Sequence, residues 1–599
     1  MNRIVWFHLF IAALSIKAAN PDYDDSVEKV FNFSGSPGQF SVRVDEAIQR
    51  TFHTKRATRQ RVFQTVETTL EHISGYQAEL NGTTLKTEIG AIESEDVFYT
   101  DARFFSVALP PTLKVGDRLS VSFHRTYKDF YYLPMEVVPN VDRLSEYSLE
   151  YHFPEDLEID FEIQYADKAL PVSIERTPGK VVLSLVDLDY RKPKAYFPFN
   201  NAHAWIIPRF SEKESKHGAS ATEDFAKWYR SRLNGELDVG STAVQALLNE
   251  ANAKDGTLEK LAVLYGYVQE EIRYIASFKG SQSIIPRSPK DILSTQFGDC
   301  KDRVILIQRL AKELGIDVDF TLISSECEPE FDSVNIGLFD HAICSYQGPE
   351  NRIFFDPTHP TLPFETLSYA LNDKKAFVIS DEPGWVTTPA LPLKPNELEL
   401  RIMLDVSQPQ QAKSTITLNG NLAAYVLQSG ELDESVAAEN QLSNLVTQFL
   451  RKVSCDYFEK KEETRSSLQY EAIADFSESL VTSTSKCYLP LTLFNFGDKD
   501  LVARSEDEQV IDLLPMSISL SLDFKHEGYE FLGPSKEIPI LEPFGSIAYE
   551  PDGENATSLH FRIHTPTVMR NGLERQKFIK MVSQYMSHRN SYFIFRRRT

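Results

Sequence analysis

Phe297-Gly298-Asp299-Cys300-Lys301-Asp302-Arg303 lies at the middle of the chain, and apolar residues at helical spacing follow it. Gly315 is typical of a helix end, so we expect a helix of about three or four turns that starts at or just before Cys300. Unpaired backbone N–H groups and the positive end of the helix dipole favour a thiolate at that position. Taken alone, however, Cys300 is better explained as a small buried residue that packs the helix start.

Two later residues change this interpretation. His341 and Asp356 lie in two segments that have the character of strands, with a turn at residues 347–351 between them. A hairpin centred between residues 348 and 349 would make His341 and Asp356 cross-strand partners, with Cβ atoms roughly 4.5–5.5 Å apart. Considered separately, His341 could be a core histidine paired with a carboxylate, and Asp356 could be a turn residue at the end of a strand. Together with Cys300 they favour a nucleophile, a base and an orienting acid.

Three sequence blocks resemble the signature of bacterial transglutaminase-like proteins, which belong to the papain-like superfamily. The resemblance covers roughly residues 220–365 and preserves the order Cys, His, Asp. It implies Cys300 as nucleophile, His341 as general base and acid, and Asp356 as the orienting residue. The blocks are Gly298-Asp299-Cys300-Lys301-Asp302, Phe339-Asp340-His341-Ala342-Ile343 and Phe355-Asp356-Pro357-Thr358.

One position departs from the pattern of these relatives, and one role is not assigned by it. Asp340 stands where relatives often carry Asn. For the donor that would stabilise an oxyanion, the backbone N–H of Cys300 is one candidate and the side chain of Gln282 is a weaker one.

Composition limits the class of protein. The chain has 599 residues, which predicts three or four domains, and its net charge of −23 argues against nucleic acid and against an anionic membrane surface as partners. No Cys-x-x-Cys spacing indicates structural zinc, and we expect no cofactor. The cysteine count is odd, so at least one stays unpaired within the chain, although Cys455 and Cys487 could pair in an oxidising compartment. The five are Cys300, Cys327, Cys344, Cys455 and Cys487.

The flanks indicate an exported, multidomain α+β protein. Residues 1–19 predict a signal peptide, because their apolar run is shorter than the ~20 residues of a membrane span, and the mature protein is expected in the periplasm or outside the cell. Residues 20–210 alternate like the strands of a β-sandwich and resemble the uncharacterised β-domain of exported Bacteroidetes-type proteins. Residues 211–365 are the expected papain/transglutaminase-like α+β core, and residues 366–599 the expected C-terminal β-rich domain with helices.

Further expectations concern individual segments. Periodicity predicts helices at 221–233, 241–253, 258–275, 436–453 and 573–589. The arginines at 596–598 are expected to form a solvated tail.

The function predicted from these features is that of an exported cysteine enzyme acting on peptide or protein amide bonds through a thioester. Hydrolysis is favoured over transamidation because it needs no second specific substrate. One alternative is a non-catalytic binding or envelope-assembly protein that retains the fold. A third interpretation is metal binding by Cys300, His341 and Asp356. The expected partner is a peptide or protein substrate, with the cell envelope as one source, and not nucleic acid.

Overall fold

The described part of the computed structural model forms two compact units. The first unit comprises Met1–Thr358 and Asp373–Thr388. The second unit comprises His359–Asn372 and Pro389–Thr599. The finer division at residues 210 and 365 stays a prediction. The predicted signal peptide and Cys327 lie outside the described residues. These are 23–36, 39–92, 98–138, 143–164, 172–189, 205–212, 221–325 without 234 and 236, 334–390, 396–423, 442–443, 450, 452–464, 467–491, 493, 516–539, 541, 544–565, 577, 580–581, 584–585, 587–588 and 590–598.

The predicted fold class, a multidomain α+β chain with a central α+β core, is wrong. Strands make up 49% of the structure and helices 20%, so the chain is multidomain and β-rich. The periodicity that predicts a helix can be seen within one segment of sequence, whereas a strand joins a sheet by pairing with residues far away in the sequence. The amount of sheet was therefore harder to predict than the helices. Strands β22 (Lys375–Ile379) and β23 (Gly384–Thr387), for example, join the sheet of β19 (Val318–Ile323) after more than fifty residues.

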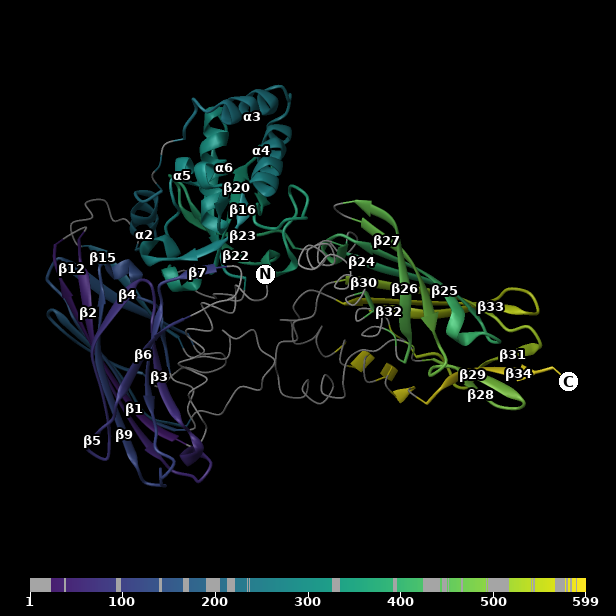
Figure 1. Cartoon of the computed structure of the whole chain (residues 1–599), viewed down its shortest axis with the longest axis horizontal. Coiled ribbons are helices and arrows are strands. Elements are labelled where there is room, and N and C mark those ends of the chain that lie inside the picture. The colour runs from purple at the N-terminus through teal and green to yellow at the C-terminus, as the bar shows by residue number, and fades with distance from the viewer. Residues whose placement is uncertain are drawn as a thin grey trace. The chain divides into compact units, whose positions relative to one another are not determined.

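The N-terminal part of the first unit is built on an eight-stranded sheet with the order β13-β14-β11-β1-β2-β9-β4-β5 (Figure 1). Apolar residues alternate along its strands, so one face packs and the other is wetter. Its strands are β1 (Tyr23–Ser34), β2 (Ser41–Phe52), β4 (Glu71–Leu80), β5 (Thr83–Thr84), β9 (Arg118–Tyr127), β11 (Arg143–His152), β13 (Ser173–Thr177) and β14 (Lys180–Asp189).

Two three-stranded sheets share buried clusters with this large sheet. One sheet has the order β10-β15-β12, and its Ile159 packs in the same cluster as Leu149 of β11. The other has the order β3-β8-β6, and its Phe105 packs with Val121 of β9. The strands are β3 (Val62–Glu67), β6 (Thr87–Ala91), β8 (Arg103–Ala108), β10 (Glu136–Val137), β12 (Leu157–Gln164) and β15 (Trp205–Glu212).

The rest of the first unit contains the helices and the sheet that carry the candidate site. The sheet has the order β21-β20-β19-β22-β23, and α6 packs against β19 and β20 while α4 packs against α6 (Figure 1). The first three predicted helices are present with shorter bounds: the helix predicted at 258–275 ends at Glu271, and Arg273–Tyr274 form a strand instead. The elements are α2 (Ala221–Arg230), α3 (Thr242–Asn252), α4 (Thr257–Glu271), α5 (Pro289–Thr295), α6 (Cys300–Glu313), β20 (His341–Gln347) and β21 (Arg352–Phe355).

Two short parallel pairs complete this region. Strand β16 (Arg273–Tyr274) pairs with β18 (Phe297–Gly298), directly before α6. Strand β17 (Ala276–Phe278) pairs with β7 (Phe98–Thr100), a strand from the N-terminal part of the unit. Both pairs therefore tie distant segments to the neighbourhood of Cys300.

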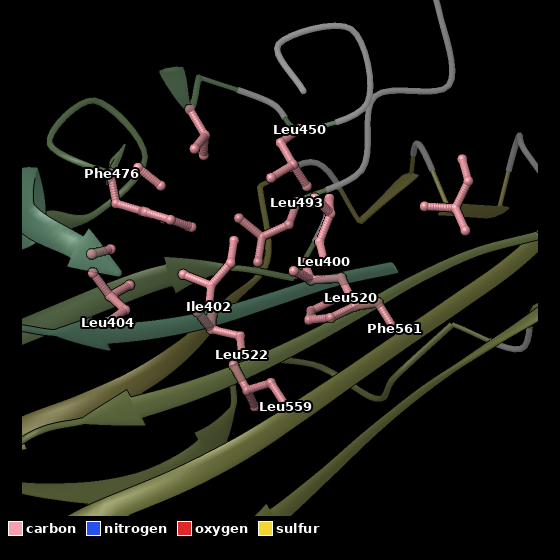
Figure 2. Close-up of a cluster of buried hydrophobic side chains, with 14 of the residues drawn as sticks. Leu400, Ile402, Leu404, Leu450, Phe476, Leu493, Leu520, Leu522, Leu559 and Phe561 are labelled. Atoms are coloured by element: carbon pink, nitrogen blue, oxygen red, sulfur yellow. The ribbon is translucent and has the colours of Figure 1, made fainter. Parts of the chain in front are cut away.

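The second unit consists of a seven-stranded sheet, β26-β27-β25-β24-β30-β33-β32, and a four-stranded sheet, β28-β29-β34-β31. One leucine-rich core joins them, and Figure 2 shows Leu400, Leu520 and Leu559 within it. The strands are β24 (Glu397–Asp405), β25 (Ala412–Asn419), β26 (Ser454–Thr464), β27 (Ser467–Asp475), β28 (Val481–Thr482), β29 (Lys486–Pro490), β30 (Met516–Lys525), β31 (Tyr529–Pro534), β32 (Gly545–Pro551), β33 (Ala556–Thr565) and β34 (Tyr592–Arg597).

Several expectations for this unit can be assessed. The predicted helices at 436–453 and 573–589 fall mostly outside the described residues. The arginines at 596–598 are exposed, as expected of a solvated segment, but Arg596 and Arg597 lie in β34 and not in a tail, and Arg596 pairs with Glu530 at 2.5 Å. Cys455 and Cys487 are free and buried, so they form no disulfide. In the part of the chain that the structure describes, no helix has the length and apolar character required to cross a membrane.

Candidate active site

Cys300 is the first residue of α6, as its sequence context predicts. The side chain of the preceding residue, Asp299, caps the helix by accepting a hydrogen bond from the backbone N–H of Asp302 at 3.3 Å. The backbone N–H of Cys300 has no acceptor among the described residues. The thiol is free and partly exposed, whereas the other described cysteines are buried. Cys300 therefore combines an accessible sulfur with the N-terminal end of a helix dipole.

Buried charges hold this helix start in place. Asp299 forms an ion pair with Lys301 and accepts a hydrogen bond from the backbone of Ser277 at 3.3 Å. Asp302 receives two hydrogen bonds from Arg287, from the backbone N–H and from Nε, both at 2.8 Å. Burial raises the pKa of Asp299, and Lys301 partly opposes that shift. Each side of the Cys300 backbone is thus anchored by a carboxylate with specific partners.

His341 and Asp356 form the second part of the site. Nε2 of His341 lies 3.0 Å from Oδ2 of Asp356. The carboxylate is completely buried, and the side chain of His341 is 11% exposed. Oδ1 of Asp356 accepts from the backbone N–H of Thr358 at 2.9 Å and from its hydroxyl at 2.6 Å. The buried carboxylate is therefore fully hydrogen-bonded and fixes one nitrogen of the ring.

The hairpin that carries these two residues has a different register from the predicted one. Cys344 pairs with Phe355, which centres the turn between residues 349 and 350 and would place Thr358, not Asp356, opposite His341. The register is displaced by two residues, and a shift of two keeps every side chain on the same face of the sheet. His341 consequently reaches Asp356 along a diagonal, a direction that a long side chain can span.

The pKa values of the pair move in opposite directions. Burial would lower the pKa of His341, but the charge of Asp356, the hydrogen bond with it and the interaction with the Cys300 thiol raise it well above its ordinary value. Burial would raise the pKa of Asp356, but His341 and the hydrogen bonds from Thr358 lower it. Because Nε2 is engaged by the carboxylate, Nδ1 is the ring nitrogen available to Cys300. The arrangement favours an imidazolium at His341, next to the sulfur of Cys300.

Three residues near the site were missed by the sequence analysis. Arg303 donates to the backbone carbonyl of Pro357 at 2.6 Å and also to that of Ile272, so it ties α6 to the segment after Asp356. Tyr274 and Tyr229 both interact electrostatically with Cys300. Arg303 lies within the segment 297–303, whose charged residues are the signal that points to it. The tyrosines follow no periodic pattern that would have indicated them.

Gln282 is exposed and lies in the short 3-10 helix Gly280–Ser283. It lines a cavity of about 450 Å³ that also includes Arg287, Ser288 and Asp291. Cys300, His341 and Asp356 do not line that cavity. The role of Gln282 as an oxyanion donor stays a prediction.

A metal site is a separate question. Across the residues whose placement is described, no group of three or more His, Cys, Asp or Glu side chains is arranged to hold a metal ion. The third interpretation, metal binding by the three predicted residues, therefore has no geometric support.

Comparison with known proteins gives a likeness of fold. A "putative protease" from Parabacteroides distasonis aligns with a TM-score of 0.61 and 12% identity, over 96% of this chain and 100% of that chain. At this identity the likeness shows a shared fold alone. No protein-family model and no curated protein matches the sequence.

Two other solved structures align much less well. A "putative nutrient binding protein" from Legionella pneumophila has a TM-score of 0.20 and 11% identity, over 50% of this chain and 93% of that chain. A "putative cysteine protease" from Cytophaga hutchinsonii has a TM-score of 0.16 and 12% identity, over 56% of this chain and 78% of that chain. TM-scores this low carry no argument about this chain.

Proposed function

We propose that the protein is a cysteine peptidase or amidase that cleaves peptide or protein amide bonds through a thioester on Cys300. The observation that carries the proposal is the hydrogen bond of 3.0 Å between His341 and Asp356, made by a ring that also interacts with the Cys300 thiol. A buried, oriented imidazole next to an accessible sulfur at a helix start is the arrangement that nucleophilic catalysis by cysteine requires. The Parabacteroides neighbour, which shares the fold, is itself described as a putative protease.

The reaction would begin with attack of the Cys300 thiolate on the carbonyl carbon of the scissile amide. A carbon–sulfur bond forms and the carbonyl electron pair moves to oxygen. When the tetrahedral intermediate collapses, the carbon–nitrogen bond breaks and Nδ1 of the His341 imidazolium gives its proton to the departing amine. The neutral ring then takes a proton from water, which attacks the thioester and releases the acid and the thiolate. Asp356 would keep Nε2 engaged throughout.

Transamidation would use the same three residues, with an amine in place of water. We favour hydrolysis because no acceptor site for a second substrate is needed. Adding methylamine to the reaction separates the two: hydrolysis gives mainly the free acid, whereas transamidation gives mainly the methylamide. The proposal includes export to the periplasm or the exterior and a substrate from the cell envelope, as the sequence predicts.

The test uses the purified full chain with p-nitrophenyl acetate, a small activated ester, and with a library of fluorogenic peptide amides. We expect a burst of p-nitrophenolate and peptide cleavage from the unmodified protein, and neither from Cys300→Ala. Cys455→Ala is the matched control, because Cys455 is a buried cysteine of the other unit, and it should retain both activities.

Thiol labelling gives a second readout that needs no substrate. Iodoacetamide should modify Cys300 much faster than the buried Cys344, as measured by mass spectrometry of peptides from the labelled protein. Equal turnover by the unmodified protein and Cys300→Ala, or uniformly slow labelling, would remove the cysteine mechanism. A non-catalytic binding protein would then be the better description.

A further inference from the structure

The sequence leaves the oxyanion donor unassigned, and one side chain of the structure fits that role. Tyr274 lies in β16, where it pairs with Gly298 of β18, two residues before Cys300. The backbone N–H of Ile275 donates to the carbonyl of Gly298 at 3.1 Å, and that of Arg273 donates to Gln296 at 2.9 Å. Tyr274 is thus fixed by backbone pairing against the strand that leads into the nucleophile.

The ring of Tyr274 is also held from the helix side. The guanidinium of Arg303 lies 5.5 Å from the centre of the ring. Arg303 follows Cys300 by three residues in α6, so the two side chains share one face of the helix. Arg303 in turn donates to the carbonyl of Pro357, next to Asp356. The ring therefore lies on the face of α6 that carries the nucleophile.

The hydroxyl of Tyr274 is available to a ligand. It makes no hydrogen bond within the described part of the chain, and the residue is only half-buried. Burial raises its pKa well above the ordinary value, and electrostatic interaction with Cys300, Asp299 and Asp356 raises it further. The hydroxyl therefore keeps its proton over the whole physiological range of pH.

The second tyrosine near the nucleophile is engaged elsewhere. The hydroxyl of Tyr229 donates to the backbone carbonyl of Ile284 at 2.6 Å. A hydroxyl has a single proton to donate. Tyr229 therefore cannot serve a substrate without giving up a structural hydrogen bond, whereas Tyr274 can.

We propose that the hydroxyl of Tyr274 and the backbone N–H of Cys300 together donate hydrogen bonds to the substrate oxygen that becomes negative when the thiolate attacks. The assignment rests on the proposed cysteine mechanism and specifies how it stabilises the tetrahedral intermediate. No proton is transferred in this step: the carbonyl electron pair moves to oxygen and both donors keep their hydrogens. Loss of one such donor typically slows the chemical step by roughly 10²- to 10³-fold.

The test compares Tyr274→Phe with the unmodified full chain in two reactions of the same sulfur. Acylation by p-nitrophenyl acetate passes through an oxyanion, whereas alkylation by iodoacetamide develops no charged carbonyl oxygen. We expect the Cys300-dependent acylation rate of Tyr274→Phe to fall by roughly 10²- to 10³-fold while its alkylation rate stays unchanged. Tyr267→Phe is the matched control, since that half-buried ring on α4 lies next to Glu271 instead, and both of its rates should stay unchanged.

Each other outcome has a defined meaning. An unchanged acylation rate in Tyr274→Phe would overturn the assignment. Equal loss of the acylation and alkylation rates would also overturn it, because that result would show that Tyr274 only positions the sulfur. A burst that survives in Cys300→Ala would instead overturn the cysteine mechanism itself. Failure of the assignment and failure of the proposed function are therefore distinguished by different variants.

Discussion

The carboxylate of Asp356 accepts a hydrogen bond from Nε2 of His341 at 3.0 Å on one oxygen and two hydrogen bonds from Thr358 on the other. All three donors approach a group that is completely buried. A buried carboxylate with every contact satisfied has little freedom to rotate, because rotation would break several charge-assisted hydrogen bonds. The orientation of the His341 ring is consequently fixed by Asp356, and the position of Asp356 by Thr358.

Asp356→Asn tests this relationship. The variant keeps the shape of the side chain but removes its charge, and an amide can present a donor to Nε2 where the carboxylate could only accept. We expect the pKa of His341 to fall, because burial still opposes protonation and its main counterweight is lost. The acylation rate with p-nitrophenyl acetate should fall by roughly 10⁴-fold, as when the orienting acid of a triad is neutralised. An NMR titration of His341, assigned with His341→Gln, measures the pKa.

Asp340→Asn provides the matched control for that substitution. Asp340 precedes His341, and its carboxylate accepts from the backbone N–H and the hydroxyl of Ser325, both at 2.8 Å. An asparagine can accept the same backbone hydrogen bond through its side-chain oxygen. We expect this variant to keep the acylation rate and to lower the pKa of His341 much less than Asp356→Asn does, because the charge of Asp356 is the main one that raises it. Equal losses in both variants would show that Asp356 has no special relation to the ring.

Thr358→Val tests how the acid is held. The substitution removes the hydroxyl that donates to Oδ1 of Asp356 at 2.6 Å and leaves the backbone N–H of residue 358 as the remaining donor to that oxygen. The pKa of Asp356 should rise, and the free energy of unfolding should fall by about 1.5–3 kcal/mol, the range for hydrogen bonds to charged groups. Urea denaturation measures the stability. Thr358→Ser keeps the hydroxyl, so its free energy of unfolding should fall much less. A serine variant as unstable as the valine variant would contradict the role of the hydroxyl.

The shifts of His341 and Asp356 also predict a pH dependence of stability. The folded-state pKa of His341 is raised, so its contribution is complete below the unfolded value of ~6.5 and is lost as pH rises through the folded value. The folded-state pKa of Asp356 is lowered, so its contribution is present above ~3.9 and is lost as pH falls through the folded value. The pair should therefore stabilise the first unit most between these limits.

Urea denaturation of the unmodified protein and of His341→Gln at several pH values measures this contribution. The difference in unfolding free energy should be largest in weakly acidic solution and should shrink at strongly alkaline pH. A difference that stays constant from acidic to alkaline pH would show that the pair does not titrate as inferred.

Local signals in the sequence predicted the elements of the site better than their long-range arrangement. The start of α6 at Cys300 and its end before Gly315 follow from a capping aspartate and a glycine with φ of +71°. The hairpin register was wrong by two residues because the turn lies one position later than its composition suggested. The prediction that His341 and Asp356 share one face of the hairpin was still correct, because side chains alternate between faces with a period of two.

The fold class and the tyrosine contacts could not be derived in the same way. Strand β22 joins the sheet by pairing with β19, and β23 joins it by pairing with β22. The sequences of β22 and β23 do not indicate which strands they pair with. Tyr274 lies in a strand of two residues, which is too short to show any periodicity. Its place beside Cys300 depends on pairing with β18, more than twenty residues later.

Gly298→Ala tests whether the helix start must be this tightly packed. A Cβ at residue 298 would lie 2.7 Å from Cβ of Asp302, and Asp302 cannot easily move because Arg287 holds its carboxylate with two hydrogen bonds. We expect a loss of about 1–3 kcal/mol in unfolding free energy and slower alkylation of Cys300 by iodoacetamide. Gly266→Ala is the control, since its Cβ would meet no atom within 4 Å in α4, and it should gain roughly 0.5–1 kcal/mol. A neutral Gly298→Ala would mean that Cys300 does not depend on this contact.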